Sequence, residues 1–139
     1  MKKQKGQVIV EFALVLPLFL LLLFGIIYGG MLFYDYSVLS SLARSGAREA
    51  AISSDIANQH TTIEDYYTGI ISPKNSTDKP LITSLYSPKN ENEFKITPDG
   101  DWTKGIKVTI TMERNPVPIL VEMVLPEEYK IEYYMKKDG

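Results

Sequence analysis

The sequence predicts an α+β protein in which a long N-terminal transmembrane α-helix continues into a small antiparallel β-sheet domain. First, an uncharged apolar run reaches from Phe12 to Tyr34, and a spanning helix needs about 20 such residues. Second, helix-forming residues continue without proline from Ser37 to Asn58. Third, apolar and polar residues alternate from Gly105 onward, which is the pattern of half-buried strands.

The apolar run is expected to cross the cell membrane once, in contact with membrane lipid. Lys2, Lys3 and Lys5 precede it, and a short cluster of basic residues stays on the cytoplasmic side. A secretory signal peptide would have a shorter apolar core followed by small residues. We therefore expect a cytoplasmic N-terminus and an extracytoplasmic C-terminal domain.

Two features of this segment exceed what an anchor requires. Glu11 lies at the edge of the apolar run, where a carboxylate is costly unless it meets a cation. Gly25 and Gly29 have the spacing that lets a second helix approach closely in lipid, although glycine is also simply common in membrane helices. Glu11 therefore needs a partner, and the glycines are candidates for helix packing.

The residues around Gly6 resemble a class III prepilin peptidase site, because Lys5 to Phe12 read Lys-Gly-Gln-Val-Ile-Val-Glu-Phe. The run Glu-Phe-Ala-Leu-Val-Leu-Pro that begins at Glu11 is similar to TadE-like pseudopilins of the tight-adherence (Tad) pilus system. The Ala- and Arg-rich stretch at residues 43–51 and the proline-rich link between the last two strands extend the resemblance, which covers roughly residues 5–55 and 104–137.

The resemblance implies cleavage between Gly6 and Gln7 by a prepilin peptidase, which makes Glu11 the fifth residue of the mature chain. In such families the glutamate is thought to offset the α-amino group of a neighbouring subunit. The implied organisation is a leader at residues 1–6, a transmembrane and assembly helix at 7–36, and an extracytoplasmic helix plus sheet domain at 37–139. Other pilins, pseudopilins and the Tad assembly platform are the implied partners.

The extracytoplasmic part begins with the continuation of the long helix, which we expect to end near residues 58–60. A stripe of Val38, Leu42, Ala43, Ala47, Ala50 and Ile52 predicts the face that contacts the domain. A second helix is predicted at Thr62 to Ile71, because Thr61 and Glu64 have capping-box spacing. Its apolar stripe is Ile63, Tyr66, Tyr67 and Ile70.

Four strand candidates follow. Leu81 to Tyr86 is weak, whereas Phe94 and Ile96 alternate ahead of a Pro-Asp-Gly turn at 98–100 that favours a hairpin. Gly105 to Arg114 is predicted to bury Ile106, Val108, Ile110 and Met112. Tyr129 to Lys136 is predicted to bury Tyr129, Ile131, Tyr133 and Met135.

The link at residues 115–126 is apolar yet interrupted by prolines, which exclude an ordinary central strand. We expect it to cover the edge of its own domain. The alternative is an exposed apolar loop that contacts the outer leaflet or a neighbouring subunit.

The composition narrows the function classes. The chain has no cysteine and one histidine, His60, which argues against thiolate or histidine metal sites, and no cofactor motif occurs. The formal net charge of −2 argues against a nucleic-acid partner, and no small-molecule substrate or enzymatic activity is indicated. The resemblance to TadE-like pseudopilins implies the function of a minor subunit or assembly factor of Tad-type pili in adherence and biofilm formation. The alternative is an uncleaved single-pass protein with an extracytoplasmic binding domain.

Overall fold

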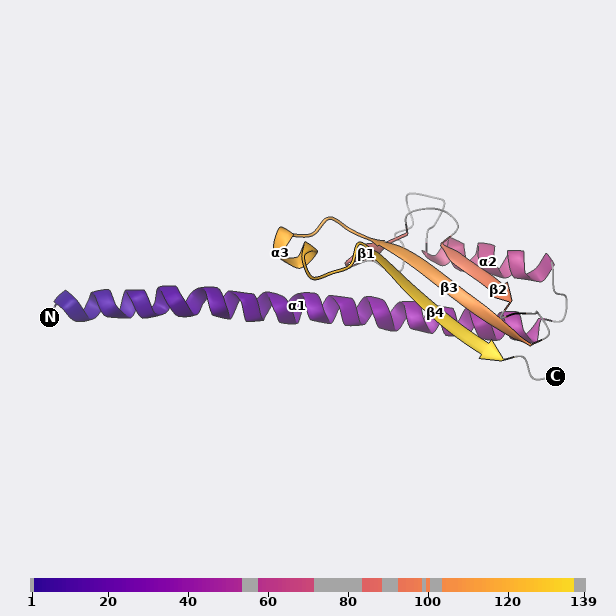
Figure 1. Cartoon of the computed structure of the whole chain (residues 1–139), viewed down its shortest axis with the longest axis horizontal. Helices are drawn as coiled ribbons and strands as arrows, with labels where there is room; N and C mark the ends of the chain where they lie inside the picture. Colours follow the sequence, from indigo (N-terminus) through magenta and orange to yellow (C-terminus); the bar gives the residue numbers. More distant parts are fainter. Residues whose placement is uncertain are drawn as a thin grey trace.

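The computed structural model describes residues 2–53, 58–71, 84–88, 93–98, 100 and 104–136. Helix α1, Lys2–Ile52, has 51 residues and continues through Pro17, so it is about 75 Å long at 1.5 Å per residue (Figure 1). The predicted continuation is confirmed, but the expected end near residues 58–60 is wrong, because Asn58 already belongs to the next helix. Serine and aspartate, which follow Ile52 in the sequence, compete with the backbone for hydrogen bonds and favour a helix end.

Helix α2, Asn58–Ile71, begins four residues earlier than predicted. The predicted capping box is wrong, because Thr61 lies inside the helix. The Oε1 atom of Glu64 instead accepts a hydrogen bond from the backbone N–H of Ile96 at 2.6 Å. The predicted apolar stripe is confirmed at Ile63 and Tyr67, which are buried, whereas Tyr66 is 63% exposed. Helix α2 is therefore joined to the sheet through both a hydrogen bond and apolar packing.

The sheet is antiparallel and is built around a central strand. Its strands are β1 (Tyr86–Ser87), β2 (Phe94–Pro98), β3 (Gly105–Arg114) and β4 (Glu128–Lys136). Strands β1 and β2 lie one after the other along one edge of β3, and each pairs with it. Strand β4 pairs with the other edge of β3. The weak strand candidate at 81–86 is confirmed only at Tyr86, which begins β1, and is wrong at Ser84 and Leu85, which form a bend. Residues 81–83 lie outside the described residues.

One face of the sheet is covered by the C-terminal part of α1 and by α2 (Figure 1). The alternation predicted for the third strand is confirmed, because its apolar residues are buried and the residues between them are half-exposed. The predicted stripe of α1 is confirmed except at its end, where Ile52 is 73% exposed. The core contains Leu39, Ala43, Ala47, Ala50, Ile63, Tyr67, Ile71, Leu85, Tyr86, Phe94, Ile96, Ile106, Val108, Ile110, Met112 and Ile131.

Small residues on α1 allow the sheet to approach the helix closely. Gly46 is buried against the ring of Phe94, and a Cβ atom on this glycine would stand 2.4 Å from the Cζ atom of that ring. Phe94 in turn stacks on Tyr67 with ring centroids 4.9 Å apart. The glycine therefore makes room for the aromatic pair that joins α1, α2 and β2.

Candidate assembly and membrane interface

The N-terminal half of α1 projects beyond the rest of the chain (Figure 1). This helix is long and apolar enough to cross a membrane, and none of its most apolar stretch is buried. The uncharged run from Phe12 to Tyr34 is about 34 Å long, which matches a hydrocarbon core about 30 Å thick. Most of its large side chains face outward, and Leu14, for example, is 74% exposed, whereas Tyr28 and Leu32 near its end pack against the core. Lipid or other helices are the surroundings that suit such a surface.

The residues of the predicted peptidase site lie near the free end of α1. Gly6, Gln7 and Glu11 all belong to the helix and are exposed. No side chain that the structure describes forms an ion pair with Glu11. A cation for this carboxylate would therefore come from outside the described part of the chain.

Gly25 and Gly29 lie one turn apart on the same helix, and a Cβ atom on either would meet no atom within 4 Å. Glu11 and Gly29 are 29 − 11 = 18 residues apart, which is about five turns, so they share one side of α1. The structure thus aligns the predicted assembly residues along one side of the helix. Their expected contacts with other subunits stay a prediction.

Asp35 is an important residue that the sequence reasoning missed. It follows the apolar run directly and is 0% exposed. Its Oδ2 accepts a hydrogen bond from the backbone N–H of Leu85 at 2.9 Å, and its Oδ1 accepts one from that of Ser84 at 3.3 Å. The spacing of Asp35, Leu39 and Ala43, four residues apart on one helix face, is the pattern that could have revealed a buried carboxylate.

Two tyrosines lie next to this carboxylate, where the sheet begins. The rings of Tyr86 and Tyr129 are 5.2 Å apart, and the Tyr86 hydroxyl donates to the carbonyl oxygen of Pro126 at 3.1 Å. Burial raises the pKa of both phenols, and the negative charge of Asp35 adds to the effect. The rings are therefore held neutral at this end of the domain.

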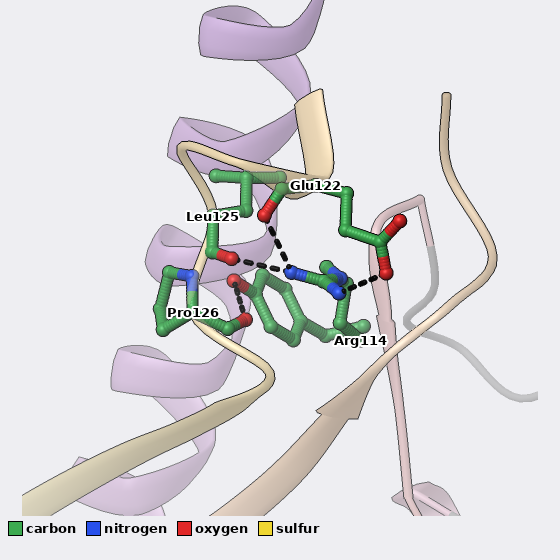
Figure 2. A network of polar contacts seen from close by, with 5 residues as sticks. Arg114, Glu122, Leu125 and Pro126 are labelled. Atoms are coloured by element: carbon green, nitrogen blue, oxygen red, sulfur yellow. Dashed lines mark hydrogen bonds and ion pairs between the residues drawn. The ribbon is translucent and has the colours of Figure 1, made fainter. Parts of the chain in front are cut away.

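The link between β3 and β4 is held by Arg114, whose guanidinium is surrounded by acceptors (Figure 2). Its Nη1 donates to the carbonyl oxygens of Glu122, at 3.0 Å, and of Leu125. Its Nη2 lies 2.8 Å from the Oε1 atom of Glu122. The arginine side chain is only 12% exposed, so it fixes the shape of the loop from within.

The same link contains the short helix α3, Ile119–Glu122, and it presents apolar side chains to the outside. The prediction that this segment covers its own domain is wrong for Ile119, Leu120, Met123 and Val124, which are 75%, 79%, 80% and 81% exposed. Val117 and Leu125 do pack against the core. The bonds from Arg114 hold the segment in a closed turn, and a turn of this shape cannot lay all its side chains on the sheet.

An exposed, membrane-length helix that continues into a small antiparallel sheet defines a single-pass, membrane-anchored α+β protein. Residues 6–48 match the TadE family, described as TadE-like protein. The N-terminal part of the chain is therefore similar to TadE-like proteins, and the match lies entirely within α1. The predicted resemblance is confirmed there, whereas residues 104–137 lie outside the match. No curated protein and no solved structure matches the chain.

Proposed function

We propose that this chain is a minor pseudopilin of a Tad-type pilus, processed by a prepilin peptidase and acting as a subunit or assembly factor in adherence and biofilm formation. The observation that carries the proposal is the TadE-like match, which begins at Gly6, on a helix whose apolar surface is exposed. The role is structural rather than enzymatic. The other pilins and the assembly platform are its proposed partners.

Cleavage is proposed between Gly6 and Gln7, with the N-terminus in the cytoplasm. The cut removes Lys2, Lys3 and Lys5, which otherwise hold the N-terminus at the cytoplasmic surface. Without them, α1 can move from lipid into a bundle of helices. The exposed position of Gly6 on the projecting part of α1 supports access by a membrane peptidase.

Assembly is proposed to use one side of the released helix. The α-amino group of Gln7 in a neighbouring subunit supplies the cation for Glu11, and pairing offsets the cost of placing a carboxylate in hydrocarbon. Gly25 and Gly29 let the neighbouring helix approach. Because Glu11 and Gly29 share a side of α1, one neighbour can satisfy both requirements.

The test of processing is coexpression with a class III prepilin peptidase, followed by intact-mass measurement. We expect the wild type to lose residues 1–6 and Gly6→Ala to remain full length. Gly30→Ala is the matched control, because a Cβ atom there also meets nothing within 4 Å. A wild-type chain that keeps residues 1–6 would favour an uncleaved anchor with an extracytoplasmic binding domain.

The test of assembly is Glu11→Ala in the native host. We expect normal cleavage and membrane insertion but impaired piliation and surface attachment, because the register of the subunit is lost. Asp65→Ala, which removes an exposed carboxylate from α2, is the control and is expected to assemble normally. Normal pilus production by Glu11→Ala would contradict the pairing role.

A further inference from the structure

We propose that the turn formed by α3 and the residues after it inserts into the outer surface of the membrane that α1 spans. We call this segment, residues 118–125, the α3 tip. Its contact would be the acyl chains and glycerol region of the lipid, reached by Ile119, Leu120, Met123 and Val124. The membrane would then hold the outer domain at two places instead of one.

The first argument is the exposure of the tip. Four large apolar side chains from a short segment are each at least 75% exposed, although the same loop packs Val117 and Leu125, both half-buried, against the core. Contiguous apolar surface of this kind is seldom left in water by a soluble domain. The side chains therefore point to an apolar environment outside the domain.

The second argument is the position of the tip along α1. The α3 tip lies at the end of the domain that faces the projecting half of α1, beside the middle of that helix (Figure 1). If Glu11 marks the inner edge of the hydrocarbon, about 20 residues at 1.5 Å each place the outer edge near Met31. Tyr28 and Leu32, on either side of that position, are already half-buried against the core. The domain thus begins at the depth where the lipid ends, and its apolar tip lies at that end of the domain (Figure 1).

The third argument concerns the backbone of the tip, since lipid offers no partner for an unpaired N–H or C=O group. Pro118 has no N–H, and its carbonyl oxygen accepts from the N–H groups of Val121 and Glu122. Met123, Val124 and Leu125 donate to carbonyl oxygens inside the same turn. Arg114 satisfies the carbonyl oxygens of Glu122 and Leu125 from the domain side (Figure 2).

The charges near the tip also fit an apolar rather than an electrostatic contact. The tip has no lysine or arginine, and its carboxylate, Glu122, is paired with Arg114. Attraction to anionic lipid headgroups requires basic side chains. The proposed insertion should therefore occur in zwitterionic membranes.

The experiment uses the full chain, which has no cysteine of its own. Leu120→Cys and Ile52→Cys are labelled separately with an environment-sensitive fluorophore and reconstituted at low density into phosphatidylcholine vesicles. Ile52 is the matched control, because it is 73% exposed and apolar but lies at the far end of α1. A lipid with a nitroxide at a shallow acyl position is present in both leaflets, so the orientation of the chain does not matter.

We expect a blue-shifted emission at Leu120→Cys and about threefold stronger quenching by the nitroxide lipid than at Ile52→Cys, because only the tip reaches the interface. Val124→Cys should behave like Leu120→Cys. Equal emission and quenching at Leu120→Cys and Ile52→Cys would overturn the proposal. So would a blue shift that appears only when the chain is crowded in the vesicle, since this outcome assigns the tip to a second copy.

Discussion

The carboxylate of Asp35 accepts a hydrogen bond from the backbone N–H of Leu85 at 2.9 Å, across 50 residues of sequence. Asp35 is the first charged residue after the apolar run, so the contact fixes the sheet domain to the helix where that run ends. Both groups are buried, and a hydrogen bond to a charged acceptor is stronger there than at the surface. The attachment of the segment before β1 to the helix therefore depends on this side chain.

Replacing the carboxylate should loosen that attachment. Asp35→Ala leaves the N–H groups of Ser84 and Leu85 without their acceptor, and we expect a loss of about 3 kcal/mol in the free energy of unfolding. Hydrogen exchange in lipid nanodiscs should show faster exchange at both amides. Ser37→Ala removes an exposed side-chain bond to the carbonyl oxygen of Phe33 and should change little; an equal effect in both variants would contradict the role of Asp35.

Gly46→Ala should destabilise the domain, because its new methyl group would overlap the ring of Phe94. Overpacking costs about 1–3 kcal/mol, and the higher helix propensity of alanine returns about 1 kcal/mol, so a net loss of about 1 kcal/mol is expected. Gly69→Ala on α2 meets no atom and should stabilise by up to about 1 kcal/mol. Thermal unfolding in detergent measures the unfolding temperature of both variants. It should be lower than that of the wild type in Gly46→Ala and higher in Gly69→Ala, and a shift of the same sign in both would contradict the prediction.

Arg114→Gln should release the loop that carries the α3 tip. The variant loses the bonds to the carbonyl oxygens of Glu122 and Leu125, and we expect faster hydrogen exchange over residues 119–125. Glu122→Gln is the control, because it removes only an ion pair whose carboxylate is 54% exposed, and such pairs contribute less than about 1 kcal/mol. Equal exchange in the two variants would show that the main-chain bonds do not order the loop.

Local patterns were sufficient to predict most of the elements. The period-two alternation from Ile106 to Met112 predicted β3 with its observed bounds and its buried face. This works because successive side chains of a half-buried strand point alternately to the core and to solvent. Length and composition likewise predicted α1 as one helix. The Pro-Asp-Gly turn at 98–100 predicted a hairpin, which agrees with the antiparallel pairing of β2 and β3.

Interactions between distant segments could not be predicted in the same way. Glu64 has the spacing of a capping residue, yet its carboxylate accepts from Ile96 on a strand 32 residues away. Nothing in the sequence indicates that β2 packs beside α2, so the capping box was the only role that the spacing of Glu64 could suggest. Asp35 was missed for the same reason, and the exposure of the α3 tip was only the alternative to the favoured prediction, since both depend on how the link and β1 lie against α1.

Gly25 and Gly29 should matter for association but not for folding of the chain. Their Cα atoms face open space, so Gly25→Leu with Gly29→Leu should leave the unfolding temperature of the outer domain unchanged. The larger side chains should keep a neighbouring helix at a distance and weaken association in the membrane. Energy transfer between labelled chains in vesicles measures this, with Ile26→Leu as control. Undiminished association in the double variant would exclude the glycines from the contact.

Tyr67 should make the stability of the domain fall at alkaline pH. Burial, with a further contribution from the hydrogen bond to Glu49 Oε2 at 3.1 Å, raises the pKa of Tyr67 from 10.0 to about 12. Because the folded state holds the proton more tightly, this stabilisation is complete below pH 10 and is lost as the pH rises from 10 to 12. The loss at pH 11 is about 1 kcal/mol for Tyr67 alone. Tyr86 and Tyr129, whose pKa values are also raised, lower the stability at alkaline pH in the same way in the wild type and in both variants below.

Denaturant unfolding of the wild type and of Tyr67→Phe at pH 8 and pH 11 measures this effect. The free energy of unfolding should fall less between the two pH values in the variant than in the wild type. Tyr66→Phe, which changes the adjacent and 63% exposed ring, is the control and should keep most of the wild-type dependence, because Tyr66 makes the smallest contribution to the raised pKa of Tyr67. An unchanged dependence in Tyr67→Phe would assign the alkaline loss to the other tyrosines.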